Sequence, residues 1–95
     1  MVLKKLDPLL HSELRLAIMS VLLSVAEADF IYLQEICSAT AGNLSVQLNK
    51  LHKANYIVIK KDFVANRPRT TCSITKQGKI AFKQYIEDIK SYLHL

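Results

Sequence analysis

The sequence predicts one small, mainly helical domain with a single β-hairpin, which is an α+β fold. Its 95 residues are enough for one domain, and we expect residues 1–95 to form it. Through several segments, apolar residues recur every three or four positions, as on the buried side of a helix. Two short segments, 56–61 and 70–75, alternate between apolar and polar residues instead, which is typical of strands.

A first helix is expected from about His11 to Glu27. Asp7, Pro8 and Ser12 lie around its start and are residue types that favour helix starts. One apolar stripe is the expected core face and comprises Leu14, Ile18, Val21, Leu22 and Val25. A second stripe lies on the opposite side and comprises Leu16, Met19, Leu23 and Ala26. A helix that is apolar on both sides must be covered on both sides, either within its own core or, as we favour, by a second copy of the protein.

Two further helices with a short turn between them are expected next. Residues 29–32 are rich in aromatic and β-branched types and suit a short strand or an extended link. A brief helix should follow from Leu33 to Ala39, and the run 40–43 then breaks its pattern. The third helix should reach about Lys53, and Asn55 suits the left-handed residue that ends a helix. Its buried stripe comprises Leu44, Leu48 and Leu51. Two helices joined by such a turn form a helix-turn-helix.

The segments 56–61 and 70–75 are expected to pair as a hairpin, with 62–69 as its loop. We call this hairpin and its loop the wing. Thr75 should cap a last helix that runs from Lys76 to about Leu93. The expected order is therefore helix, strand, helix, helix, strand, wing loop, strand, helix.

The last helix, within residues 76–95, is expected to serve in a homodimer. Its apolar stripe keeps helical spacing to the end of the chain, where no later segment is left to cover it. The alternative is that this helix returns to cover the first one. The expected dimer interface comprises Leu16, Met19, Leu23, Tyr85, Ile89, Tyr92 and Leu93.

The net charge of +5 is concentrated between Asn43 and Thr71. That stretch has six basic residues and one acidic residue, Asp62, while bases and acids cancel in the rest of the chain. A polyanion would therefore meet one attractive face on an otherwise balanced protein, which is typical of nucleic-acid binding. A basic surface that only promotes solubility is the alternative, so the residue pattern must decide.

The outward face of the third helix and the wing supply the candidate DNA-binding residues. Short polar side chains at the leading turn suit base edges in the major groove, and lysines further along suit phosphates. The amides of Asn43 and Gln47 can pair with both edge groups of adenine, and Val46 with a thymine methyl group. The helix candidates are Gly42, Asn43, Ser45, Val46, Gln47, Lys50 and Lys53. The wing candidates are Lys60, Lys61, Asn66, Arg67, Arg69 and Thr70.

Several candidates have a simpler interpretation that stays open. Gly42 could let backbone N–H groups approach a phosphate, or it could merely shape the turn. Ser45 and Gln47 could be ordinary solvated residues of an exposed helix face. Arg67 and Arg69 favour the DNA interpretation, because arginine at a hairpin tip can enter a narrow minor groove or bind phosphate.

At these residues the chain resembles the small winged helix-turn-helix transcriptional regulators of the MarR and ArsR type. The similarity covers roughly Asp7 to Leu93. It implies a homodimer joined through the terminal helices, with the third helix in the major groove and the wing on the neighbouring minor groove or backbone. The runs that carry it are Thr40 to Leu48 with Lys50-Leu51, Asn55 to Ile57, Arg67 to Thr71, and Ile74 to Phe82.

Other function classes find less support in the sequence. The three histidines, His11, His52 and His94, stand apart, and no nucleophile motif or phosphate-binding glycine loop accompanies them, so we expect neither an enzyme nor a bound cofactor. A winged-helix module that binds protein or RNA is the stronger rival. An RNA-binding surface would usually show exposed aromatic residues, whereas we expect Tyr56 and Phe63 to be packed.

The cysteines and the apolar run 16–26 predict a cytoplasmic protein without a membrane partner. Cys37 and Cys72 are far apart and lack the spacing of a zinc site, so we expect no metal and two buried thiols in a reducing compartment. The run is too short to span a bilayer, and the acidic residues Asp7 and Glu13 precede it, unlike the start of a signal peptide.

Overall fold

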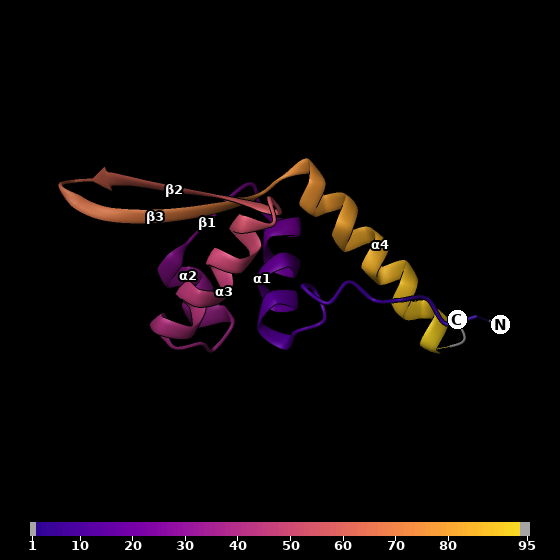
Figure 1. The fold of residues 1–95 in the computed structure, drawn as a ribbon. Coiled ribbons are helices and arrows are strands. Elements are labelled where there is room, and N and C mark those ends of the chain that lie inside the picture. The colour runs from indigo at the N-terminus through magenta and orange to yellow at the C-terminus, as the bar shows by residue number, and fades with distance from the viewer. Residues whose placement is uncertain (1, 94–95) are drawn as a thin grey trace.

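The computed structural model describes residues 2–93 and contains four helices and three strands (Figure 1). Their order is the predicted one, so the α+β fold class is confirmed. No helix within residues 2–93 is long and apolar enough to cross a membrane. The elements are α1 (Glu13–Ser24), β1 (Ala28–Asp29), α2 (Phe30–Ile36), α3 (Ala41–Lys53), β2 (Ile57–Val64), β3 (Arg67–Ile74) and α4 (Lys76–Leu93).

The three strands form an antiparallel sheet in the order β1-β3-β2. The long strands β2 and β3 pair from Ile57 opposite Ile74 to Val64 opposite Arg67, so the wing is a ribbon with a two-residue turn. The expected loop at 62–69 is therefore wrong. The turn residues Ala65 and Asn66 have φ values of 52° and 62°, as a tight hairpin turn requires.

The two-residue turn could not be predicted from the sequence for two physical reasons. Alanine seldom adopts a positive φ, so Ala65 gives no turn signal of the kind that Asn-Gly gives. Pro68 suggested a loop, but it lies within β3. Strand β1 pairs only with Thr71 and Cys72 of β3, so one side of β3 is unpaired at Pro68. That part of β3 is a sheet edge, where proline is tolerated.

The first two helices differ from prediction at their ends. Asp7 and Pro8 begin a separate turn, in which Leu9 N donates to Asp7 Oδ1 over 2.9 Å, and α1 starts only after Ser12. Helix α2 begins at Phe30 rather than Leu33, because the Asp29 carboxylate caps it by accepting from Tyr32 N at 2.8 Å.

The core gathers residues from every helix and from the two long strands. Helices α1 and α3 supply most of it, and the predicted α3 stripe of Leu44, Leu48 and Leu51 is buried. Two predictions for α1 are wrong. Met19 was expected to face a partner but is fully buried in the chain's own core, and Val25 was expected in the core but is 37% exposed because α1 ends at Ser24.

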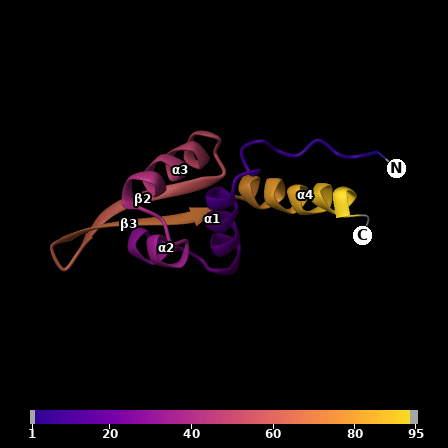
Figure 2. The same cartoon turned by 90° about the horizontal axis from the view of Figure 1, so that it is seen from below.

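Helix α4 extends away from the other helices, and the N-terminal segment runs beside it (Figures 1 and 2). Tyr92 Oη donates to Lys4 O over 2.7 Å, which ties the two segments together. Phe82 and Tyr85 of α4 belong to the core. Tyr85 was expected in the dimer interface, and this prediction is wrong because its side chain is only 4% exposed. The distal half does not return to cover α1, and Ile86 and Leu93 stay 38% and 57% exposed.

The start of α4 is joined closely to the end of α3. Asn55 has the predicted left-handed conformation, with a φ of 64°. Thr75 caps α4 as predicted, since its Oγ1 accepts from Gly78 N at 2.9 Å. A Cβ at Gly78 would lie 2.1 Å from Tyr56 O, so only glycine fits where α4 approaches the α3–β2 link.

Candidate nucleic-acid interface

Helix α3 presents a polar face opposite its buried leucines, as predicted. Asn43, Ser45, Lys50 and Lys53 are exposed, and Val46 is 50% exposed in their midst. Thr40 caps the helix, since its Oγ1 accepts from Asn43 N at 3.2 Å. The candidate base-contacting side chains therefore stand on the first two turns of a capped helix.

Gly42 lies in the first turn of α3 and has an ordinary helical backbone rather than a positive φ. A Cβ placed there would meet no described atom within 4 Å. Neither the turn nor the packing requires a glycine at this position. The interpretation in which Gly42 merely shapes the turn thus loses its support.

Gln47 differs from the other polar residues of this face because its amide is held by hydrogen bonds. Arg15 in α1 donates from Nη1 to Gln47 Oε1, and from Nε to Leu9 O. Gln47 Nε2 in turn donates to Asn43 Oδ1 over 3.0 Å. Sequence analysis missed Arg15, which is half-buried and 32 positions from Gln47, because no local pattern indicates such a pair.

The wing carries its cations on both faces of the ribbon. Because side chains alternate along strands, the pairing puts Lys60, Arg67 and Arg69 on one face and Lys61 on the other. Lys61 and Thr70 share a shallow hollow with Ser45 of α3. The basic residues of the wing therefore do not form one face with α3, as the single attractive face expected from the sequence would require, because Lys60, Arg67 and Arg69 face away from Lys61.

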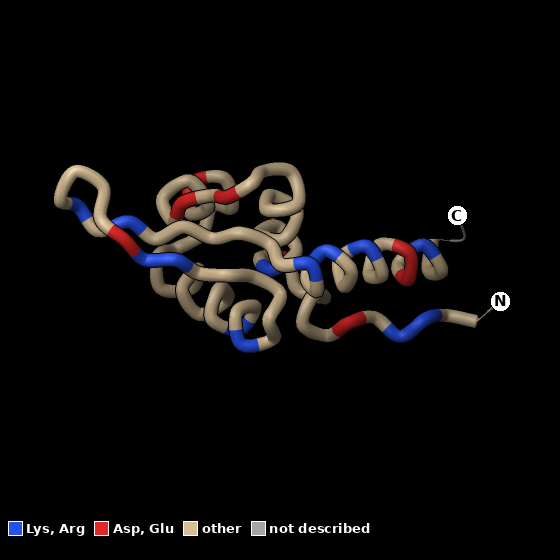
Figure 3. Tube along the Cα trace, turned by 90° about the horizontal axis from the view of Figure 1, so that it is seen from above, with Lys and Arg blue, Asp and Glu red and all other residues tan. Residues whose placement is uncertain are grey.

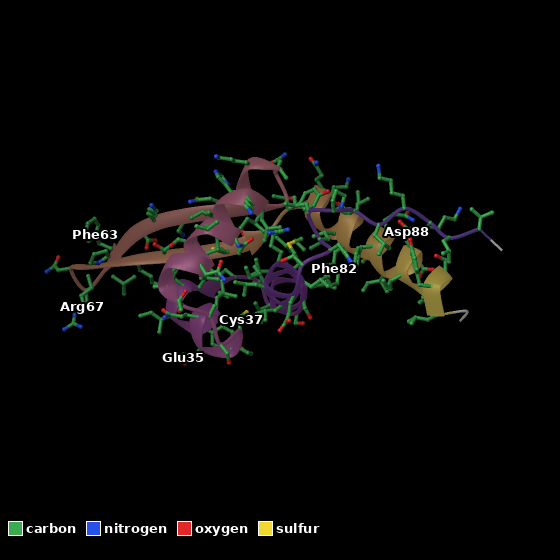
Figure 4. The ribbon with its side chains drawn as sticks, turned by 60° about the horizontal axis from the view of Figure 1, so that its bottom comes forward. Glu35, Cys37, Phe63, Arg67, Phe82 and Asp88 are labelled. Atoms are coloured by element: carbon green, nitrogen blue, oxygen red, sulfur yellow. The ribbon has the colours of Figure 1, made fainter. Side chains whose placement is uncertain are left out.

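The hairpin tip lies beyond α2 and α3 and carries Phe63 and Arg67 (Figure 4). Phe63 is 74% exposed and pairs with Pro68, so the expectation that it is packed is wrong. The ribbon extends past the helices, so no helix covers this position (Figure 4). Tyr56 is half-buried instead, and its hydroxyl donates to Asp7 Oδ2 at 2.6 Å.

Charges of opposite sign gather on the wing and on the α2 side, while α4 and the N-terminal segment carry both signs (Figure 3). Basic positions follow the wing, which also carries the acidic Asp62, and the far end of α3, whereas acidic positions gather on the α2 side. Within the wing, Lys60 forms an ion pair with Asp62 at 3.6 Å, and both residues are substantially solvent-exposed. Such a pair stabilises the fold by at most about 1 kcal/mol, so Lys60 stays available to a phosphate.

These features match a known kind of domain. The family model for the winged helix DNA-binding domain matches residues 14–93. The chain belongs to this family. The predicted identity of the fold, with its helix-turn-helix and its wing, is thereby confirmed.

Three similar proteins share the sequence or the fold of this winged helix. The uncharacterized protein MJ0432 of Methanocaldococcus jannaschii is 35% identical over 79 residues, which are 83% of this chain and 86% of that protein. The transcriptional regulator homologue of Pyrococcus horikoshii OT3 superposes with a TM-score of 0.83 at 30% identity, over 90% of this chain and 85% of that chain. Apo MarR of E. coli superposes with a TM-score of 0.71 at 15% identity, over 88% of this chain and 60% of that chain.

Two of the three histidines make contacts inside the winged helix. His11 Nδ1 lies 2.9 Å from Tyr85 Oη, and His52 Nδ1 lies 3.3 Å from Ile57 O, so both rings are used in local contacts. His94 lies outside the described residues. No group of three His, Cys, Asp or Glu residues that could hold a metal occurs within residues 2–93. The family is described as DNA-binding, and the Pyrococcus horikoshii structure as that of a transcriptional regulator homologue.

Burial governs the chemistry of both cysteines in this winged helix. Cys72 is buried, and desolvation raises the pKa of its thiol to about 11. Cys37 is only half-buried, although burial also raises the pKa of its thiol. Neither residue is in a disulfide, and both stay protonated near neutral pH.

Proposed function

We propose that this protein is a transcriptional regulator that binds double-stranded DNA sequence-specifically as a homodimer in the cytoplasm. Helix α3 enters the major groove, and the wing binds the adjacent minor groove or backbone. The observation that carries this proposal is the hollow in which Lys61 and Thr70 of the wing meet Ser45 of α3. A polar helix face and a cationic ribbon side by side can contact bases and phosphates of one duplex at once.

The exposed face of α3 supports the major-groove placement. Its first two turns carry short polar groups and Val46, while Lys50 and Lys53 stand near its end. A helix that enters a major groove brings its leading residues to base edges and leaves later residues beside the backbone. Gly42 at the first turn would let the backbone approach a phosphate closely.

The shape of the wing supports its placement at a minor groove or along its edge. A minor groove is bounded by two phosphate backbones, and a ribbon between them turns one face to each. Lys61 on one face and Arg67 and Arg69 on the other would then each have a phosphate within reach. Asn66 lies in the turn at the very tip, where it could follow the groove floor.

The uncovered side of α4 supports a homodimer. Exposed apolar residues share one side of its distal half, where Ile86 is 38% and Leu93 is 57% exposed. A second copy would cover them. Without Met19 and Tyr85, and with Ile86 added, the proposed interface comprises Leu16, Leu23, Ile86, Ile89, Tyr92 and Leu93. A twofold dimer would contact half-sites about one helical turn, or a multiple of it, apart.

Selection from a random duplex library, followed by footprinting, tests this function. We expect an enriched palindromic site whose affinity falls with salt at a log–log slope of about −0.9 per contacted phosphate. Light scattering should report a dimer, and Ile86→Glu with Leu93→Glu should yield a monomer with reduced affinity. Enrichment of no sequence, or a wild-type monomer at micromolar concentration, would contradict the corresponding part of the proposal.

The exposed Phe63 favours one second candidate, a module that binds single-stranded RNA. An aromatic ring beside cations can stack on an unpaired base. Competition between the selected duplex and either of its strands, as DNA and as RNA, separates the two functions. We expect the duplex to win, and a preference for single-stranded RNA would support the second candidate.

A further inference from the structure

We propose that Arg15 is a positioning residue for base recognition. It holds the amides of Gln47 and Asn43 so that both present N–H donors, rather than carbonyl acceptors, to the major groove. This inference rests on the proposed function of α3 as the base-contacting helix. It adds a residue from α1 that touches no DNA itself and narrows the set of bases that α3 can recognise.

The donor character of arginine fixes the first amide. A guanidinium group has five N–H donors and no acceptor. Because Arg15 Nη1 contacts the side-chain amide of Gln47, that amide must turn its oxygen toward Arg15. The second bond, from Arg15 Nε to Leu9 O, holds the guanidinium in place at its other edge. The nitrogen of Gln47 therefore points away from α1.

The second amide is fixed by the first. Gln47 Nε2 donates to Asn43 Oδ1 over 3.0 Å, one helical turn earlier on α3. Asn43 must therefore direct its oxygen forward along the helix, toward Gln47, and its nitrogen outward. Asn43 is exposed, while Gln47 is half-buried behind it. What this pair offers to a ligand is two N–H bonds of Asn43 and the remaining N–H bond of Gln47.

This arrangement changes the expected base preference. Bidentate pairing of an amide with adenine needs its oxygen at N6–H and its nitrogen at N7 together. Both oxygens here are directed at protein donors, so the adenine pairing expected for Asn43 and Gln47 is disfavoured. Outward N–H groups suit acceptors instead, which are N7 and O6 of guanine, N7 of adenine and O4 of thymine. The N4–H₂ edge of cytosine should be rejected.

Selection with modified bases tests the donor assignment. For the wild-type protein we expect the bases contacted by α3 to expose acceptors. Replacing a contacted purine by its 7-deaza analogue should weaken binding by about 5- to 150-fold. In Arg15→Met the Gln47 amide is free to turn, so discrimination against cytosine at that position should fall by a comparable factor. Arg15→Lys keeps a donor without an acceptor and should retain most of the discrimination.

Two controls keep a folding defect from being mistaken for a change in recognition. Thermal unfolding of each variant reports stability, and affinity for a duplex without the site reports general DNA binding. Should Arg15→Met fail to fold, Gln47→Glu supplies a second measurement. Its carboxylate accepts from Arg15 but cannot donate to Asn43, so acceptance of adenine and cytosine opposite Asn43 should rise.

The role of Arg15 would be overturned if folded Arg15→Met kept the base preference of the wild type. It would also be overturned if Gln47→Glu kept that preference at the base opposite Asn43. Either result would leave the proposal of sequence-specific binding intact. Absence of any base preference in the wild-type protein would overturn the proposed function, and this inference with it. The two failures are distinguishable because only the second involves the unmodified chain.

Discussion

Helix α3 and the tip of the wing are both polar, exposed and cationic, yet they are built differently. On α3, Asn43 and Gln47 are joined to each other, and Gln47 to Arg15, by directed hydrogen bonds. At the wing tip, within residues 2–93, Arg67 and Arg69 have no ion-pair partner. Discrimination between bases needs donors in fixed directions, whereas attraction to a phosphate needs only charge. The difference suggests that α3 selects the site and the wing supplies affinity.

The largest expected effect is on affinity, from removing the wing's arginines. Arg67→Ala with Arg69→Ala should weaken binding to every duplex by about 100-fold, because each lost charge-assisted contact costs about 1.5 kcal/mol. The salt slope should become shallower by about 1.8. Anisotropy titrations over a range of salt concentrations measure both quantities.

The matched control for the wing is Lys76→Ala with Lys79→Ala, which removes two exposed cations from the start of α4. It lowers the net charge equally and should change affinity far less. Equal losses in the two double variants would mean that only net charge matters, and the wing would have no special role.

The next effect is on specificity, from changing α3. Asn43→Ala should reduce discrimination at one base position by about 1 to 3 kcal/mol, because a directed contact is lost. Affinity for a duplex without the site should stay close to that of the wild type. Competitive binding to single-base variants of the site measures this. A uniform loss on all duplexes would place Asn43 with the wing as a residue of general affinity.

Substitutions of the two glycines distinguish a residue that the fold requires from a residue that contacts DNA. Gly78→Ala should destabilise the protein by about 1 to 3 kcal/mol, because its Cβ would lie 2.1 Å from Tyr56 O. Gly42→Ala should stabilise it by up to about 1 kcal/mol, since alanine is the better helix former. Chemical denaturation measures both. If Gly42 approaches a phosphate, the stabilised Gly42→Ala variant should nevertheless bind DNA more weakly; unchanged binding would remove Gly42 from the interface.

The smallest expected effect is on stability at alkaline pH. It concerns Tyr56, which lies between the end of α3 and the start of β2. Burial and its bond to Asp7 raise the pKa of Tyr56 from 10.0 to about 12, and burial raises that of Cys72 from 9.0 to about 11. The folded state holds both protons more tightly than the unfolded state, so stability should fall as pH rises from about 9 to 12. Tyr56→Phe should remove the part between 10 and 12. An identical alkaline profile in this variant would exclude Tyr56 as a source.

The sequence predicted the features that depend on interactions between residues close together in the chain. The leucine stripe of α3, the left-handed Asn55 and the cap at Thr75 each depend on residues within one or two helical turns, and all three were predictable. Met19 and Tyr85 were misassigned because their burial depends on how α1, α4 and the N-terminal segment pack together. The hydrogen bond between Arg15 and Gln47 joins residues 32 positions apart, so no periodic pattern in the sequence indicates it.

Methylation interference on the selected site tests the division between α3 and the wing most directly, since dimethyl sulfate marks guanine N7 in the major groove and adenine N3 in the minor groove. We expect N7 methylation to block binding at guanines opposite α3. If the wing enters the minor groove, methylation of adenine N3 should interfere at positions that flank these guanines. In the double variant Arg67→Ala with Arg69→Ala the N3 interference should disappear, while the N7 interference should stay. A protected site at which no N7 methylation interferes would contradict the placement of α3 in the major groove.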